Sequence, residues 1–187
     1  MKKVILALVI LFAGIATANA KSDVTVTNGS LRELKGSKAQ VFVRWDYSNS
    51  TIEDKEVATY LKERGEDWER DYNSELAKAE NNFNSRLNDK SKDVQTVNDE
   101  NSADYIIVIK VKDFHYGITA LSVVIGMGAG DAHLTGTMEI YKKGQAEPIA
   151  VVDIDGVPGA GYGNEVRRIE AYRELAEQFA KLVKKAK

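Results

Sequence analysis

The sequence contains no cysteine and, among its 187 residues, only two prolines and two histidines. Without cysteine there are no disulfides, so a packed hydrophobic core must stabilise the fold. The same absence excludes a lipid anchor on a cleavage-site cysteine and any metal site that needs a thiolate ligand. No linker rich in proline or glycine divides the chain, and residues 21–187 are therefore expected to form a single domain.

A strong excess of either charge is also missing. The chain has 26 basic and 28 acidic residues, and removal of Lys2 and Lys3 with an expected leader leaves 24 against 28, a net charge of −4. A nucleic-acid-binding protein needs a clustered basic surface. The lysines of residues 181–187 end a predicted helix, where cations complement the helix dipole. We therefore expect no nucleic-acid partner.

Residues 1–20 have the three parts of a secretory signal peptide. Two lysines precede the apolar run Val4–Ile15, and the small residues Ala18 and Ala20 precede the expected cleavage after Ala20. The apolar run is shorter than the about 20 residues that span a bilayer. The sequence predicts a periplasmic or secreted chain with no transmembrane span after cleavage and no lipid anchor.

Three stretches carry the clearest strand patterns. Ala103–Val111 is rich in β-branched residues, and its odd-numbered side chains are expected to face helices. Asp131–Tyr141 and Pro148–Gly156 alternate apolar and polar residues and are joined by a turn. They predict an antiparallel hairpin in which Met138 lies opposite Ala150, which places both apolar sets on one side.

Two amphipathic helices are expected to cover this sheet. Apolar residues recur every three or four positions from Trp68 to Leu87 and again from Val166 to Val183. A further strand over Ala39–Tyr47 and short edge strands complete the pattern. The predicted fold is α+β: a two-layer sandwich in which a mainly antiparallel sheet of about four to six strands packs on two amphipathic helices. One face of the sheet should remain open to solvent.

The motifs that suggest a cofactor are incomplete. Gly126, Gly128 and Gly130 lack the lysine and the following helix of a phosphate-binding loop, and they predict a tight connection instead. If Gly156 is set at the sixth position of a calcium loop, Val151 and Tyr162 stand where carboxylates are needed. We therefore expect no cofactor and identify no catalytic residue.

The two histidines leave an enzymatic alternative open. His115 and His133 flank one predicted hairpin and, together with Asp131, could form the centre of a small hydrolase or metal-dependent enzyme. Strand alternation places the two imidazoles on opposite faces of the sheet. Only a β-bulge would bring them together.

The connection Ile118–Met127 is unusually long and apolar for a loop between strands. If exposed, it would mark a partner or membrane contact. An extra strand or a flap over the end of the sheet is the favoured interpretation. The residues proposed for this contact are Ile118, Leu121, Val123, Val124 and Met127.

Several of these features together resemble a loose group of uncharacterised bacterial envelope proteins. The features are the signal peptide, the long helix before a polar turn, Ala103–Tyr105 opening a strand, Gly126–Gly130 leading into Ala132–Tyr141, and the glycine loop before the last helix. The resemblance covers residues 41–185 and implies an α+β domain similar to the small N-terminal domain of TolB or to outer-membrane assembly lipoproteins. Many members carry a lipid on a cysteine, which this chain lacks.

The leading hypothesis is therefore an exported, non-enzymatic domain that binds a protein or another envelope component. It would use the open sheet face or the Ile118–Met127 segment. The alternatives are the enzyme centred on the histidines and a structural subunit that forms homo-oligomers.

Overall fold

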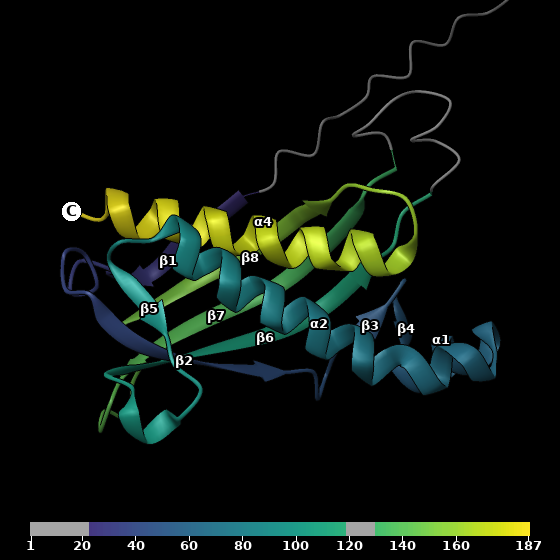
Figure 1. Ribbon diagram of the computed structural model, residues 1–187, viewed down its shortest axis with the longest axis horizontal. Helices are drawn as coiled ribbons and strands as arrows, with labels where there is room; N and C mark the ends of the chain where they lie inside the picture. Colours follow the sequence, from purple (N-terminus) through teal and green to yellow (C-terminus); the bar gives the residue numbers. More distant parts are fainter. Residues whose placement is uncertain (1–22, 119–129) are drawn as a thin grey trace, which may run out of the picture.

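The computed structural model describes residues 23–118 and 130–187, which form an eight-stranded sheet and three α-helices (Figure 1). The helices are α1 (Val57–Arg64), α2 (Glu66–Lys90) and α4 (Asn164–Lys185), and a short 3₁₀ turn spans Glu100–Ser102. The strands are β1 (Asp23–Gly29), β2 (Ala39–Asp46), β3 (Thr51–Ile52), β4 (Lys55–Glu56), β5 (Val94–Thr96), β6 (Tyr105–His115), β7 (Ala132–Lys142) and β8 (Ala150–Gly159).

The sheet is mixed, with the strand order β1-β8-β7-β6-β2-β5. Strands β6, β7, β8 and β1 pair antiparallel in turn, whereas β2 pairs parallel to both β5 and β6. The parallel pair β2 and β6 is joined by a crossover that contains α2, as parallel strands require. A small β3–β4 hairpin pairs with the far end of β6.

The α+β class is confirmed, but the expected count of four to six strands is too low. The sequence indicated an edge strand near Val94, where β5 lies, but not β3 and β4, which have only two residues each. Such short strands give no periodic signal in a sequence, because alternation needs at least four residues to be visible.

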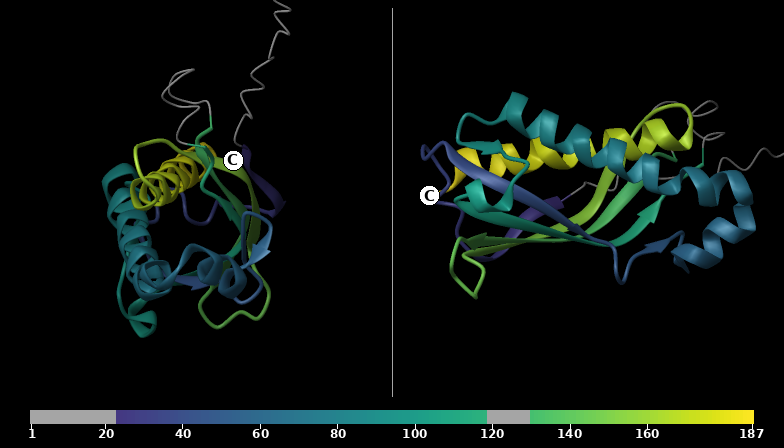
Figure 2. Two further views of the ribbon diagram at one scale, coloured as in Figure 1. Left: turned by 90° about the vertical axis from the view of Figure 1, so that its right-hand side faces the viewer. Right: turned by 60° about the horizontal axis from the view of Figure 1, so that its bottom comes forward.

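Helices α2 and α4 lie side by side across one face of the sheet (Figures 1 and 2). The odd-numbered residues of β6 up to Val111 face them, and Tyr105, Ile107 and Ile109 are buried as expected. From the helices, Phe83 and Phe179 are fully buried in the same core, and Trp68 packs at its edge. The helical conformation is interrupted between α1 and α2 at Gly65, whose φ of 103° is readily adopted only by glycine.

The predicted register of the β7–β8 hairpin is wrong by two residues. Ala150 pairs with Ile140, and Met138 pairs with Val152. A shift of two residues leaves every side chain on the face that was expected, because successive side chains alternate with a period of two. The apolar set on each strand is accordingly buried: Met138, Ala150 and Val152 are each at most 1% exposed.

Bulges change the side-chain alternation near one end of the sheet. The β6–β7 register shifts between Val111 and Asp113. Phe114 and Tyr116 therefore enter the core although their numbers are even, while Asp113 and His115 share the opposite face.

Several expectations fall on residues outside the described ranges. They include the signal peptide over residues 1–20 and four of the five contact residues, Leu121, Val123, Val124 and Met127. Ile118 is described and is 58% exposed. No helix in the described ranges is long and apolar enough to cross a membrane.

Candidate functional site

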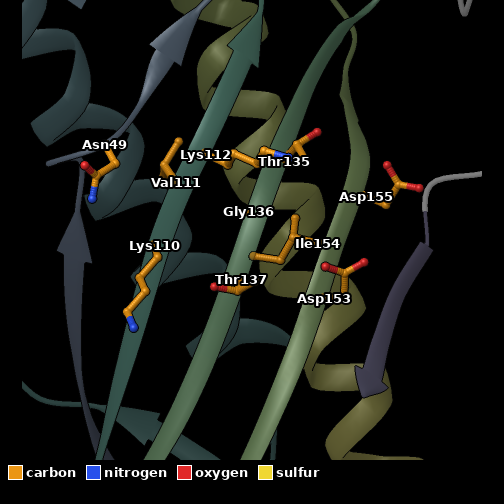
Figure 3. A pocket seen from close by; sticks show the side chains of 10 residues that line it. All are labelled: Asn49, Lys110, Val111, Lys112, Thr135, Gly136, Thr137, Asp153, Ile154 and Asp155. Atoms are coloured by element: carbon orange, nitrogen blue, oxygen red, sulfur yellow. The ribbon is translucent and has the colours of Figure 1, made fainter. Parts of the chain in front are cut away.

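The face of β6, β7 and β8 that turns away from α2 and α4 carries polar side chains in three columns (Figure 3). Lysines 110 and 112 stand on β6, threonines 135 and 137 on β7, and aspartates 153 and 155 on β8. The register makes one of these rows continuous, since Lys110 pairs with Thr137 and Thr137 pairs with Asp153. The open face is therefore basic on one strand and acidic two strands away.

These columns border a hollow of about 480 Å³. Gly136 lies at its floor, where a Cβ atom would come within 2.3 Å of the Lys110 carbonyl oxygen, so only glycine lets β6 and β7 approach this closely. Asn49, from the turn after β2, closes the basic side of the hollow. The lining offers amide, hydroxyl, ammonium and carboxylate groups to a bound molecule.

A second polar group continues the open face beside this hollow. Lys110 Nζ donates to Glu139 Oε1 at 2.7 Å, and the Tyr141 hydroxyl donates to Glu139 Oε2 at 2.6 Å. Burial raises the pKa of Glu139, but the two donors and the charge of Lys110 lower it by more, so the pKa lies below its ordinary value. The hydrogen bond to Glu139, aided by burial, raises the pKa of Tyr141 to about 12.

The bulged end of β6 forms a separate cluster with the β3–β4 turn. His115 Nε2 lies 2.7 Å from Asp113 Oδ2 and 3.7 Å from Asp54 Oδ2. Its other ring nitrogen, Nδ1, lies 2.9 Å from Glu53 Oε2. The donor atoms of Asp54, Asp113 and His115 all lie within 4.8 Å of one another, the spacing of a metal-ligand set.

The turn that brings these acids to His115 has an unusual backbone. Glu53 and Asp54 are its two central residues, with φ of 52° and 61°. This is the backbone of a type I′ hairpin turn, in which non-glycine residues are uncommon. Glu53 is fixed further, since its Oε1 accepts a hydrogen bond from the Tyr116 backbone N–H at 2.8 Å.

The cluster changes the acidity of its imidazole. Burial lowers the pKa of His115, but the hydrogen bond to Glu53 and the charges of Asp113, Glu53 and Asp54 raise it by more. The pKa of His115 therefore lies above its ordinary value, and the cluster favours a positive charge at the ring.

The structure brings the two histidines of the enzymatic alternative onto one face and places Asp131 elsewhere. The bulge in β6 makes His115 and His133 direct cross-strand partners, so the expectation that they point to opposite faces is wrong. Their ring nitrogens nevertheless contact different groups: His133 Nδ1 lies 3.4 Å from the Gly156 carbonyl oxygen. Asp131 lines another hollow with residues of α4, among them Arg173.

Glu53, Asp54 and Asp113 were not identified from the sequence. The one available signal was the run Asp113–Tyr116, where polar and apolar residues continue to alternate but with the opposite parity from residues 105–111. Such a change of phase within one strand is typical of a bulge. No sequence pattern joins His115 to a turn about 60 residues earlier in the chain.

No protein-family model matches the chain, and a search of curated proteins gives no match. Among solved structures, the chain is similar to the PelC dodecamer from Paraburkholderia phytofirmans, at 13% identity and a TM-score of 0.42, over 83% of this chain and 97% of that one. A single-substitution form of the same PelC gives 12% identity and a TM-score of 0.38, over 83% and 95% of the two chains.

Proposed function

We propose that this chain is an exported, non-enzymatic domain, built as a two-layer sandwich, whose open sheet face binds another component of the cell envelope. The observation that carries the proposal is the ordered polar surface around the 480 Å³ hollow. The signal-peptide pattern of residues 1–20 and the resemblance to envelope proteins support export.

The charges on this face are arranged for a partner. Lys112 on β6 and Asp155 on β8 are both exposed and are separated by two strand spacings, roughly 9–10 Å. In the described part of the chain neither side chain takes part in an ion pair, so each charge can act on a bound molecule. Threonine hydroxyls between the charges both donate and accept hydrogen bonds, which suits a partner rich in polar groups.

A binding role fits the site better than a catalytic one. The enzymatic alternative needs His115, His133 and Asp131 to act on one substrate. Asp131 instead lines a different hollow together with residues of α4, and the ring nitrogens of the two histidines contact different groups. A substrate on the open face would therefore meet at most two of the three groups.

Capture from envelope extracts tests the proposal. We expect the purified protein to capture at least one envelope component. The double variant Lys112→Ala/Asp155→Ala should capture about tenfold less of that component, or none. The matched control is Arg70→Ala/Asp71→Ala, which removes one exposed basic and one exposed acidic residue from α2, away from the hollow. Equal capture by all three proteins would contradict binding through the open face.

One observation favours a second candidate, a subunit that forms homo-oligomers. The open face is complementary to itself in charge. A two-fold axis parallel to the strands and above β7 would place β6 of one copy over β8 of the other, with Lys112 facing Asp155 of the second copy.

Charge exchange separates the two candidates. If the face binds a second copy, Lys112→Asp should abolish self-association in sizing chromatography, and the exchange Lys112→Asp/Asp155→Lys should restore it. If the face binds an envelope component of fixed chemistry, the exchanged protein should remain unable to capture that component. A protein that is monomeric at high concentration removes the oligomer candidate.

A further inference from the structure

We propose that Asp54, Asp113 and His115 form a binding site for one divalent transition-metal ion of the zinc class. The site lies where the β3–β4 turn meets the bulged end of β6, apart from the hollow between β6, β7 and β8. It is independent of the binding function proposed for the open face.

The positions of the donor atoms call for a cation. When Glu53 accepts the Nδ1 proton of His115, the Nε2 atom presents a lone pair to the carboxylates of Asp113 and Asp54, at 2.7 and 3.7 Å. Three electron-rich atoms repel one another unless a positive charge lies between them. That charge is either a proton on Nε2 or a metal ion that displaces the proton.

The spacing fits a small ion. Around a tetrahedral ion with bonds of about 2.0–2.2 Å, neighbouring donor atoms are roughly 3.3 Å apart. The two observed separations from Nε2 lie on either side of this value. To hold the ion, Nε2 and Asp113 Oδ2 must move apart by about half an ångström, and Asp54 Oδ2, on a side chain that is 86% exposed, must move closer by a similar amount.

The surrounding residues orient the ligands. Asp113 is held through its other oxygen, Oδ1, which accepts hydrogen bonds from the Thr51 hydroxyl and from the Asp54 backbone N–H. This leaves Oδ2 directed at the imidazole. Glu53 fixes the tautomer and the ring of His115, which is the arrangement that a carboxylate beside a metal-bound histidine provides.

The ligand types select the metal. An imidazole nitrogen with two carboxylates suits Zn²⁺, Co²⁺ or Ni²⁺ better than Ca²⁺ or Mg²⁺, which prefer all-oxygen sites. The Asp113 side chain is 11% exposed and that of His115 is 37% exposed. The site is therefore anchored on its inner side and open on its outer side, where water can complete the coordination.

Zinc titration of the metal-free protein, produced without a polyhistidine tag, tests the site. Calorimetry should show one Zn²⁺ bound per chain. His115→Gln and Asp113→Asn should abolish this binding or weaken it by at least about tenfold, and Glu53→Gln should weaken it by about 10–100-fold. His133→Gln is the matched control, because it removes the other histidine of the chain at the paired position of β7. Its affinity should equal that of the unchanged protein.

Two further measurements guard against variants that do not fold. Asp54→Asn changes an exposed side chain, so Zn²⁺ should raise the melting temperature of the unchanged protein more than that of this folded variant. In nitrogen NMR of the imidazoles, Zn²⁺ should shift the His115 resonances and leave those of His133 in place. No binding at one ion per chain, or an equal loss with His133→Gln, would overturn the proposal.

Discussion

The two faces of strand β6 are built from similar residues but have different neighbours. Ile107 and Ile109 are fully buried against the helices, whereas Ile106 and Val108 lie on the open face beside Lys110. Apolar character alone therefore does not decide which face is covered. The covering helices α2 and α4 therefore determine which face forms the core, and the apolar residues of the open face are available to a partner or to water.

A matched pair of substitutions on the two faces of β6 should differ strongly in stability. Ile107→Ala should lower the free energy of unfolding by about 2–5 kcal/mol, because it leaves a cavity in a packed core. Ile106→Ala, one residue away on the open face, should lower it by less than about 1.5 kcal/mol. Urea denaturation of both variants measures the difference. Equal losses would mean that the open face is as well covered as the core.

Helix α4 offers a similar comparison between a buried arginine, Arg167, and an arginine near the surface, Arg173. Arg167 is fully buried and donates to the backbone carbonyl oxygens of Tyr116, Gly130 and Gly161. Arg167→Met retains most of the apolar contact but leaves these acceptors without this donor, so the free energy of unfolding should fall by about 2–3 kcal/mol.

The control for this substitution lies two turns along the same helix. Arg173 pairs with Glu170 at 3.0 Å near the surface, and Arg173→Met should change the free energy of unfolding by less than about 1 kcal/mol. If both arginine variants unfold at the same urea concentration, the carbonyl contacts of Arg167 contribute nothing to stability.

The sequence predicted the covered face far better than the open one. Strands β6, β7 and β8 are ten or eleven residues long, and their alternation is regular enough to assign the core. The two amphipathic helices are equally clear, because an apolar stripe of several turns has one interpretation. The alternation shows which side chains share a face, but it does not determine which residues of two strands lie opposite each other. The predicted β7–β8 pairing was therefore wrong by two residues, although each of its side chains was assigned to the correct face.

The cluster at His115 shows why the rest could not be predicted. A single extra residue near Lys112 reverses the alternation, and this moves Asp113 and His115 to the open face. Their partners Glu53 and Asp54 come from a two-residue turn between strands too short to be detected. Contacts of this kind depend on tertiary structure, so neither composition nor spacing along the chain indicates them.

The smallest expected effects concern two glutamates on opposite sides of the sheet. Burial raises the pKa of Glu80, which accepts a hydrogen bond from the Tyr47 hydroxyl beneath the helices at 2.8 Å. The pKa of Glu139 on the open face is lowered, because Lys110 and Tyr141 outweigh its burial. At pH 7, Glu80→Gln should therefore increase the free energy of unfolding and Glu139→Gln should decrease it, each by less than about 1 kcal/mol.

The pH dependence of the free energy of unfolding tests independently whether each glutamate stabilises or destabilises the fold. For Glu80 the pKa in the folded state is above the unfolded value of 4.5. Its unfavourable contribution to the free energy of unfolding therefore grows as the pH rises from 4.5 through the raised pKa. Below pH 4.5, Glu80→Gln should be as stable as the unchanged protein. For Glu139 the stabilising contribution is present above 4.5 and is lost as the pH falls through the lowered pKa. Urea denaturation at pH 4 and pH 7 measures both. If Glu139→Gln were more stable than the unchanged protein at pH 7, the Lys110–Glu139 ion pair would not stabilise the fold. The stability of the sheet would then depend on the core beneath the helices and not on the open face.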